Sequence, residues 1–230
     1  MEILITNDDG IYAEGLDILV EAALQIGNVC VVVPEAENSA CSHSITLNHP
    51  LRIRKIQPNK FVVNGTPTDC VYLGLFEIMP KLPDLVFSGI NHGPNLGIDI
   101  LYSGTVAGAM EGAGHDILSF SFSNTNPKSE WNRALFVSSI QEIVLKIQQG
   151  GFHSGCLNVN FPPAPFSKFA ITKLGKRYYE TTVQKKFDPR EKPYYWIGGS
   201  KLHYDALPCT DFEAIDQGII SITPLNLDMT

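Results

Sequence analysis

Long apolar runs are missing from this chain of 230 residues, and no stretch reaches the roughly 18 consecutive apolar residues that a membrane-spanning helix needs. Positive charge is also scarce, because 17 Lys and Arg face 24 Asp and Glu and the formal net charge is −7 at pH 7. Affinity for DNA or RNA depends on cationic side chains at the phosphates. We therefore expect no membrane span and no specific binding of a nucleic-acid polymer.

Paired cysteines are absent as well. The five cysteines are odd in number and scattered, and no Cys-x-x-Cys motif occurs among them. Such a distribution argues against a disulfide framework and against a structural zinc site. The chain also opens directly on an apolar strand, without the charged and apolar regions of a signal peptide. We expect a cytoplasmic protein with reduced thiols.

Apolar runs and helical periodicity alternate over the first 161 residues, in a composition that is 44% hydrophobic and 18% charged and is therefore ordinary for a globular protein. The pattern predicts strands at 3–5, 29–33, 45–47, 51–56, 61–63, 85–87, 117–122 and 156–161, and helices at 11–23, 69–78, after Ser103 and at 131–149. This alternation predicts an α/β core over residues 1–161, a Rossmann-like, doubly wound, mostly parallel sheet with helices on both faces.

The character of the chain changes at Pro162-Pro163-Ala164-Pro165. Residues 162–230 are expected to form a C-terminal extension, with an extended β-hairpin arm at about 170–200, a short helix at 210–216 and a returning strand at 219–223. The arm carries more aromatic side chains than an isolated ribbon in water would expose, among them Tyr178, Tyr179, Tyr194, Tyr195 and Trp196. Another subunit could cover them, or the arm could fold back over its own core.

The turn Asn7-Asp8-Asp9-Gly10 follows the first strand, at the sheet edge where open α/β proteins bind ligands. Two adjacent carboxylates repel each other, so a positive group should compensate them. A hard divalent cation such as Mg²⁺ or Mn²⁺ suits these oxygen ligands. The alternative is a plain Asx-turn in which Asp9 caps the following helix.

Two later stretches also indicate a ligand. Residues 88–97 hold three glycines and two asparagines, which is typical of backbone held close to another group. Ser103, Gly104 and Thr105 begin a helix, whose free N–H groups and dipole favour phosphate. A helix with an ordinary serine cap is the alternative.

Six stretches, taken together, carry a specific resemblance. They are Ile3-Leu-Ile-Thr-Asn-Asp-Asp-Gly-Ile-Tyr-Ala-Glu-Gly15, Asn38-Ser39 with Ser44-Ile-Thr46, Asn64-Gly-Thr-Pro-Thr-Asp-Cys-Val71, Ser88-Gly-Ile-Asn-His-Gly-Pro-Asn-Leu-Gly97, Tyr102-Ser-Gly-Thr-Val106, and Thr210-Asp-Phe212 with Ser221-Ile-Thr-Pro-Leu225. In this order, across nearly the whole chain, they resemble the SurE family of stationary-phase survival proteins, which are metal-dependent nucleoside monophosphatases.

The resemblance implies roles for particular residues. One Mg²⁺ or Mn²⁺ per subunit would be held by Asp8, Asp9, Ser39 and Asn91, with Asp8 and Asp9 central to catalysis, and the phosphate would be held by Asn95, Ser103, Gly104 and Thr105, with Asn7 supporting the site. The loop around Ser39 lacks the glycines expected beside the serine of the family, so Ser42 and Ser44 remain rivals for this ligand. The resemblance also implies a homodimer or tetramer assembled through the C-terminal arm.

The function implied is hydrolysis of 5′- and 3′-nucleoside monophosphates by a metal-activated water, with an aspartyl-phosphate on Asp8 as the second route. His43 and His92 are both open candidates for the general acid, and Glu111 is expected to be structural. Three alternatives remain: a broad phosphatase or exopolyphosphatase, a nucleotide- or metal-binding regulatory module without hydrolysis, and a receiver-like signalling module. The last lacks the phosphoacceptor Asp and late Lys that it requires.

Overall fold

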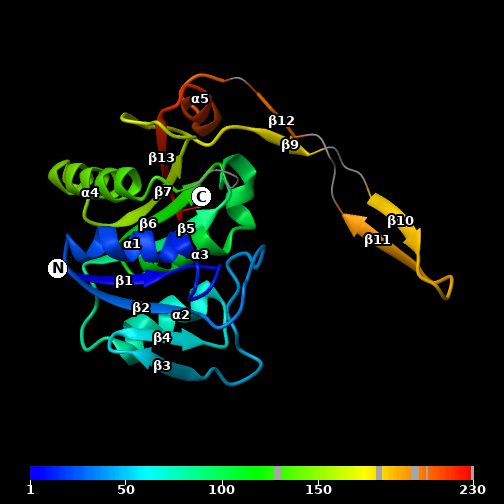
Figure 1. The fold of residues 1–230 in the computed structure, drawn as a ribbon, viewed down its shortest axis with the longest axis horizontal. Helices are drawn as coiled ribbons and strands as arrows, with labels where there is room; N and C mark the ends of the chain where they lie inside the picture. The colour runs from blue at the N-terminus through cyan, green and yellow to red at the C-terminus, as the bar shows by residue number, and fades with distance from the viewer. Residues whose placement is uncertain (127–130, 180–182, 198–201, 206, 229–230) are drawn as a thin grey trace.

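The computed structural model describes residues 1–126, 131–179, 183–197, 202–205 and 207–228. In this part of the chain, nine strands form one sheet in the order β3-β4-β2-β1-β5-β6-β7-β13-β8 (Figure 1). Their bounds are β1 Glu2–Thr6, β2 Asn28–Pro34, β3 Ile53–Gln57, β4 Lys60–Val63, β5 Leu85–His92, β6 Leu118–Asn124, β7 Gly155–Phe161, β8 Phe169–Ile171 and β13 Ile220–Leu225. The helices are α1 Glu14–Leu24, α2 Pro67–Leu73, α3 Gly104–Ala113, α4 Arg133–Gln149 and α5 Asp211–Asp216, with a π-helical turn η1 Gly74–Ile78 and a 3₁₀ helix η2 Gly97–Leu101.

The central strands β4, β2, β1, β5, β6 and β7 run parallel, and the antiparallel strand β3 lies at one edge. From β1 the chain adds strands on one side through β2 and on the other side through β5. Neighbouring β1 and β5 therefore form a topological switch point, where a crevice opens outside the carboxyl ends of the strands. The expected doubly wound α/β fold is confirmed.

Alternation along the strands builds the two faces of the sheet. In β1, Ile3 and Ile5 pack with α1 and α4 in one apolar cluster, whereas Leu4 packs with α2 in another. Successive side chains of a strand point to opposite faces, so an all-apolar strand needs cover on both. Helix α3 packs against α2 and comes so close to the sheet that a side chain at Gly112 would meet Val86.

Several expected boundaries are corrected by the structure. The strand predicted at 45–47 is wrong, because these residues form no ladder and lie in the long connection before β3. Helix α1 begins at Glu14, three residues after the predicted start, since the turn after β1 continues to Ala13. Strand β5 continues to His92, so Asn91 and His92 lie at the strand end, after a register shift that follows Ser88.

The C-terminal part contributes to the central sheet as well as to an arm. Strand β13 pairs antiparallel with β7, and β8 pairs with β13 at the edge of the sheet. The C-terminal part also forms two antiparallel ribbons. Strand β9 Arg177–Tyr179 pairs with β12 Leu202–Tyr204, and β10 Val183–Phe187 pairs with β11 Pro193–Ile197. Figure 1 shows the second ribbon far from the sheet, and every residue of β10 and β11 is exposed. The division of the chain at residue 161 stays a prediction.

Across the described ranges, none of the helices combines the length and apolarity that crossing a membrane requires.

Candidate active site

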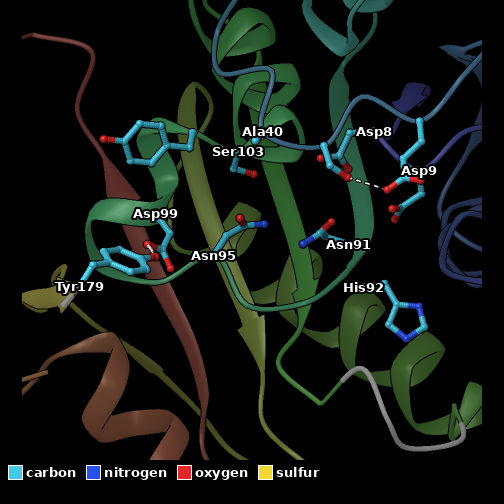
Figure 2. Close-up of a pocket in the computed structure, with 12 residues that line it drawn as sticks. Asp8, Asp9, Ala40, Asn91, His92, Asn95, Asp99, Ser103 and Tyr179 are labelled. Carbon is cyan, nitrogen blue, oxygen red and sulfur yellow. Dashed lines mark hydrogen bonds between the residues drawn. The ribbon is translucent and has the colours of Figure 1, made fainter. Parts of the chain in front are cut away.

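A cavity of about 400 Å³ opens at the carboxyl ends of β1 and β5. Its lining comes from six segments: the turn after β1, the loop after β2, the end of β5 with the loop that follows, η2 with its C-terminal cap, the start of α3, and β9. Figure 2 shows Asp8, Asp9 and Asn91 at one side of this cavity and Asp99 with Tyr179 at the other. The lining residues are Asp8, Asp9, Glu37, Ser39, Ala40, Asn91, His92, Asn95, Asp99, Tyr102, Ser103 and Tyr179.

The turn after β1 is held by its own side chains. The Asn7 amide donates to the Gly10 carbonyl at 2.8 Å, and its oxygen accepts from the Gly10 N–H at 3.2 Å. Gly10 has a φ of +87°, which glycine adopts without steric cost. Asn7 is buried and supports the turn that presents Asp8 and Asp9.

Asp8 is buried and bound to the start of α3. Its carboxylate accepts from the Thr105 hydroxyl at 2.6 Å and from the Thr105 N–H at 3.2 Å. Burial raises the pKa of Asp8 to about 6, and the neighbouring charge of Asp9 adds to the increase, while the bonds from Thr105 oppose it. Either a proton or a bound cation would offset the unfavourable burial of this carboxylate charge.

Asp9 and Glu37, the latter in the loop after β2, add two more carboxylates to the lining of the cavity. Burial raises the pKa of Asp9, the Glu37 carboxylate raises it further, and His92 lowers it. The Ser39 hydroxyl donates to Glu37 at 2.8 Å. Of the three candidate hydroxyls in this loop, all within the described part of the chain, Ser39 lines the cavity and Ser42 and Ser44 do not.

Asn91 reaches the cavity because β5 is longer than the sequence predicts. Its amide donates to the Gly93 carbonyl at 2.9 Å, so its oxygen is the atom left to act as a ligand. His92 lines the cavity and has its ring 5.6 Å from that of Trp131, edge to face. His43, in contrast, makes an ion pair of 2.9 Å with Glu111, which also contacts His115 at 3.3 Å, so Glu111 joins the loop to α3.

Helix α3 begins against Asp8. Ser103 is its N-cap, as predicted, and its hydroxyl accepts from the Val106 N–H at 3.1 Å. A side-chain carbon at Gly104 would lie 3.0 Å from Asp8 Cβ and 2.8 Å from Cys41 Sγ, so only glycine lets the helix start this close. Ser103 lines the cavity, whereas the side chain of Thr105 does not and gives its hydroxyl, with the Thr105 N–H, to Asp8. Direct contact of Thr105 with phosphate stays a prediction.

Asn95 is held by a network of buried amides. Its N–H donates to Asn160 Oδ1 at 2.9 Å, and its carbonyl accepts from the side-chain amides of Asn158 and Asn160 at 2.8 and 3.0 Å. Its own amide donates to the Ser123 hydroxyl at 2.8 Å, and the Ser121 hydroxyl donates to Asn158 Oδ1 at 2.9 Å. Hydrogen-bonded networks of buried polar groups favour one geometry, so side chains of strands β6 and β7 fix the position of Asn95.

The donor set at the carboxylate end fits a hard divalent cation. Carboxylate oxygens of Asp8 and Asp9, the Asn91 amide oxygen and the Ser39 hydroxyl form an all-oxygen group, as Mg²⁺ and Mn²⁺ prefer. Within the described ranges, no three or more His, Cys, Asp or Glu side chains are placed so that they could hold a metal ion by themselves, so the amide and hydroxyl oxygens are needed to complete the ligand set. Burial is the main cause of the raised pKa of both aspartates, and a cation at these oxygens would lower it.

The far side of the cavity was missed by the sequence analysis. Asp99, Tyr102 and Tyr179 belong to η2, its C-terminal cap and β9. Tyr102 belongs to the stretch Tyr102-Ser-Gly-Thr-Val106 but was given no role there, and no motif includes Asp99 or Tyr179. Tyr179 lies in the predicted arm, 80 residues from Asp99, to which its hydroxyl donates. Glu37 was missed as well, although it lies two residues before Ser39.

Comparison with known proteins gives a consistent result. A family model described as Survival protein SurE matches residues 3–181. The chain is 46% identical over 236 residues to a protein from Geotalea uraniireducens (strain Rf4) and 43% identical over 236 residues to one from Vibrio cholerae serotype O1 (strain ATCC 39315), both named 5'-nucleotidase SurE. Each alignment covers 100% of this chain, and 94% and 93% of the respective relative. The crystal structure of the SurE protein from Aquifex aeolicus superposes with a TM-score of 0.88 at 42% identity, over 100% of this chain and 95% of that one.

Proposed function

The chain belongs to the SurE family, and from this membership we propose that it is a 5'-nucleotidase that hydrolyses nucleoside monophosphates to nucleoside and phosphate with the help of one divalent cation. One observation supports the need for a cation most directly. The cavity lining includes Asp8, Asp9, Glu37 and Asp99, and no Lys or Arg is among the described residues that line it. A phosphate monoester is itself anionic, so it would be repelled from such a cavity unless a cation compensated the carboxylates.

Asp8, Asp9, Asn91 and Ser39 are the residues we assign to the cation, as Mg²⁺ or Mn²⁺. When bound, such an ion would polarise a phosphoryl oxygen and lower the pKa of a coordinated water. Thr105 orients Asp8 by two hydrogen bonds, and Asn7 holds the turn that carries both aspartates. Because both oxygens of Asp8 already accept hydrogen bonds from Thr105, Asp8 is better suited to bind the cation than to attack the phosphorus atom as a nucleophile.

The start of α3 is the second element of the proposal. The N–H groups of Thr105 and Val106 are given to Asp8 and to Ser103, and that of Ala107 to the Ser103 carbonyl. The Gly104 N–H therefore remains as the donor of the first turn that could bind a phosphoryl oxygen. The Asn95 side chain, which also lines the cavity, would be a second group for the phosphate. Donors preorganised in this way stabilise the charge that spreads over the equatorial oxygens in the transition state.

Protonation of the leaving alkoxide is assigned to His92. Of the two histidines considered, His92 lines the cavity, whereas His43 is paired with Glu111. A general acid must reach the leaving oxygen, and location in the cavity is the first requirement.

We also propose that two or more copies of the chain associate through the β10–β11 ribbon. Its large aromatic and aliphatic side chains are strongly exposed: Phe187 60%, Tyr195 57%, Trp196 62% and Ile197 92%. An isolated two-stranded ribbon is marginally stable in water, and a second subunit would bury this surface. Whether the assembly is a dimer or a tetramer, and whether the protein is cytoplasmic, stay predictions.

The test is phosphate release from 5'- and 3'-nucleoside monophosphates with Mg²⁺, with Mn²⁺ and with chelator. We expect release that disappears in chelator and returns with either cation. Asp8→Asn should lower the rate by roughly 10²-fold, because it removes a charge from the ligand set. Asp17→Asn, at an exposed carboxylate on α1, is the matched control. Nucleotide binding without any turnover would reject hydrolysis in favour of a sensor, and chelator-resistant turnover would reject the cation.

A further inference from the structure

A stack of planar side chains ends at the side of the cavity opposite the carboxylate pair. The rings of Tyr204 and Phe212 stack at 4.6 Å with an interplanar angle of 9°. The Arg177 guanidinium lies 6.0 Å from the centre of the Phe212 ring and 5.4 Å from that of Tyr179. Cation–π contact of this kind holds Arg177 between the two rings. Tyr179 is the last member of this stack and lines the cavity.

The orientation of Tyr179 is fixed independently of the stack. Its hydroxyl donates to one Asp99 oxygen, and the Arg177 guanidinium pairs with the other. Arg177 is only 11% exposed, so the cation behind the ring is well shielded from water. Tyr179 itself is 46% exposed. Since Arg177 occupies one face of the ring, the exposed surface includes the other face, preorganised and without a stacking partner among the described residues.

Tyr179 and the aspartate pair lie at opposite sides of the proposed phosphate site (Figure 2). Figure 2 shows Ser103 and Asn95 between Tyr179 and the Asp8–Asp9 pair. Tyr102, which directly precedes the cap of α3, is 56% exposed, lines the cavity and lies close enough to Tyr179 to add to the increase that burial causes in the pKa of the Tyr179 hydroxyl. The cavity of about 400 Å³ is within the size range of small-molecule sites. A substrate with its phosphate at the start of α3 would extend its other end toward these two rings.

We propose that Tyr179, stacked on Arg177 and oriented by Asp99, is the platform for the nucleobase, with Tyr102 beside it. This inference rests on the proposed function, and it specifies what the enzyme selects. Stacking on an aromatic ring accepts every base, because each base has a π face. Both oxygens of Asp99 are already engaged, so Asp99 orients the ring and does not read the edge of the base. The site therefore selects monophosphates that carry a base, with little preference between bases.

The test compares kcat/KM for AMP with kcat/KM for ribose 5-phosphate, which lacks the base. Tyr179→Ala should lower kcat/KM for AMP by about 10- to 100-fold, mainly through KM, because base–aromatic stacking has this magnitude. The value for ribose 5-phosphate should stay within about two-fold, as for other surface substitutions. Tyr179→Phe should keep most of the preference for AMP, because it retains the ring.

Tyr178→Ala is the matched control, because Tyr178 precedes Tyr179 on β9, points to the other face of the ribbon and does not line the cavity. An AMP to ribose 5-phosphate ratio that Tyr179→Ala leaves unchanged would overturn the proposal. An equal loss for both substrates would overturn it too, since Tyr179 would then only support the loop of Asp99.

Calorimetric binding of adenosine, which has no phosphate, separates this inference from the proposed function. Binding that Tyr179→Ala weakens, in a protein that hydrolyses nothing, would reject the nucleotidase and keep the platform. Equal hydrolysis of AMP and ribose 5-phosphate by the unmodified protein would keep the phosphatase and reject the platform.

Discussion

Gly104→Ala tests how closely the start of α3 must approach Asp8. The added methyl carbon would lie 2.8 Å from Cys41 Sγ, 3.0 Å from Asp8 Cβ and 3.1 Å from Asp8 Oδ2. Cys41 belongs to a partly exposed loop and can move, but Asp8 is held by Thr105. We therefore expect the helix start and Asp8 to separate by several tenths of an ångström.

The stability cost of this change should be small and the activity cost large. Overpacking of this kind costs about 1–3 kcal/mol, and alanine recovers about 1 kcal/mol of that by its better helix propensity. A net loss of about 0–2 kcal/mol corresponds to a fall in Tm of up to about 8 °C in a protein of this size. Misplacement of a catalytic element by about 1 Å can cost about 10²-fold in rate. Calorimetry and phosphate release from AMP measure the two effects separately.

Two further variants make the result decisive. Gly114→Ala, at the other end of α3, places its carbon no closer than 3.4 Å to any neighbour, so activity should stay within about two-fold. Cys41→Ala in the Gly104→Ala background removes the shortest contact and leaves those to Asp8, so recovery should be incomplete. Unchanged activity in Gly104→Ala, or complete recovery in the double variant, would refute the reasoning.

Three other predictions follow from the site and the arm. Asp9→Asn should abolish most activity in Mn²⁺. Its Tm without metal should hold or rise at neutral pH, because the raised pKa of Asp9 indicates that its negative charge opposes folding there. A clear drop in Tm would contradict this. Asn158→Ala should lower the free energy of unfolding by about 1–3 kcal/mol, because it leaves the Ser121 hydroxyl without its acceptor, while the Asn95 carbonyl keeps the bond from Asn160. An unchanged denaturation midpoint would contradict a stabilising role of this buried network. Replacing residues 183–197 by a short glycine linker should give a monomer in light scattering, with the helical and sheet content retained, whereas an assembly of unchanged size would show that other surfaces join the subunits.

Local interactions made much of the architecture readable from the sequence. Apolar runs such as residues 29–33 had to be buried on both faces, and the helical spacing of Phe136, Ile140 and Val144 predicted α4. The cap at Ser103 was predictable because its hydroxyl satisfies an N–H group only three residues away. Residues 45–47 misled the prediction, since alternation is not sufficient for a strand without a partner at the sheet edge.

The carboxylate side of the candidate site was accessible for a related reason. Asp8, Asp9 and Asn91 directly follow or end strands, and parallel neighbours bring those ends together at a switch point. Composition and motif spacing could therefore indicate where an oxygen-rich, cation-binding group would form.

What only the tertiary structure decided is the other half of the cavity. Thr105 faces Asp8 because α3 starts against the turn after β1, and Asn95 is oriented by amides more than 60 residues away. Tyr179 meets Asp99 because β9 passes over η2, although nothing near either residue in the sequence records that contact. Long-range packing sets these positions, and the chemistry of a single segment carries no information about the segment that will lie opposite it.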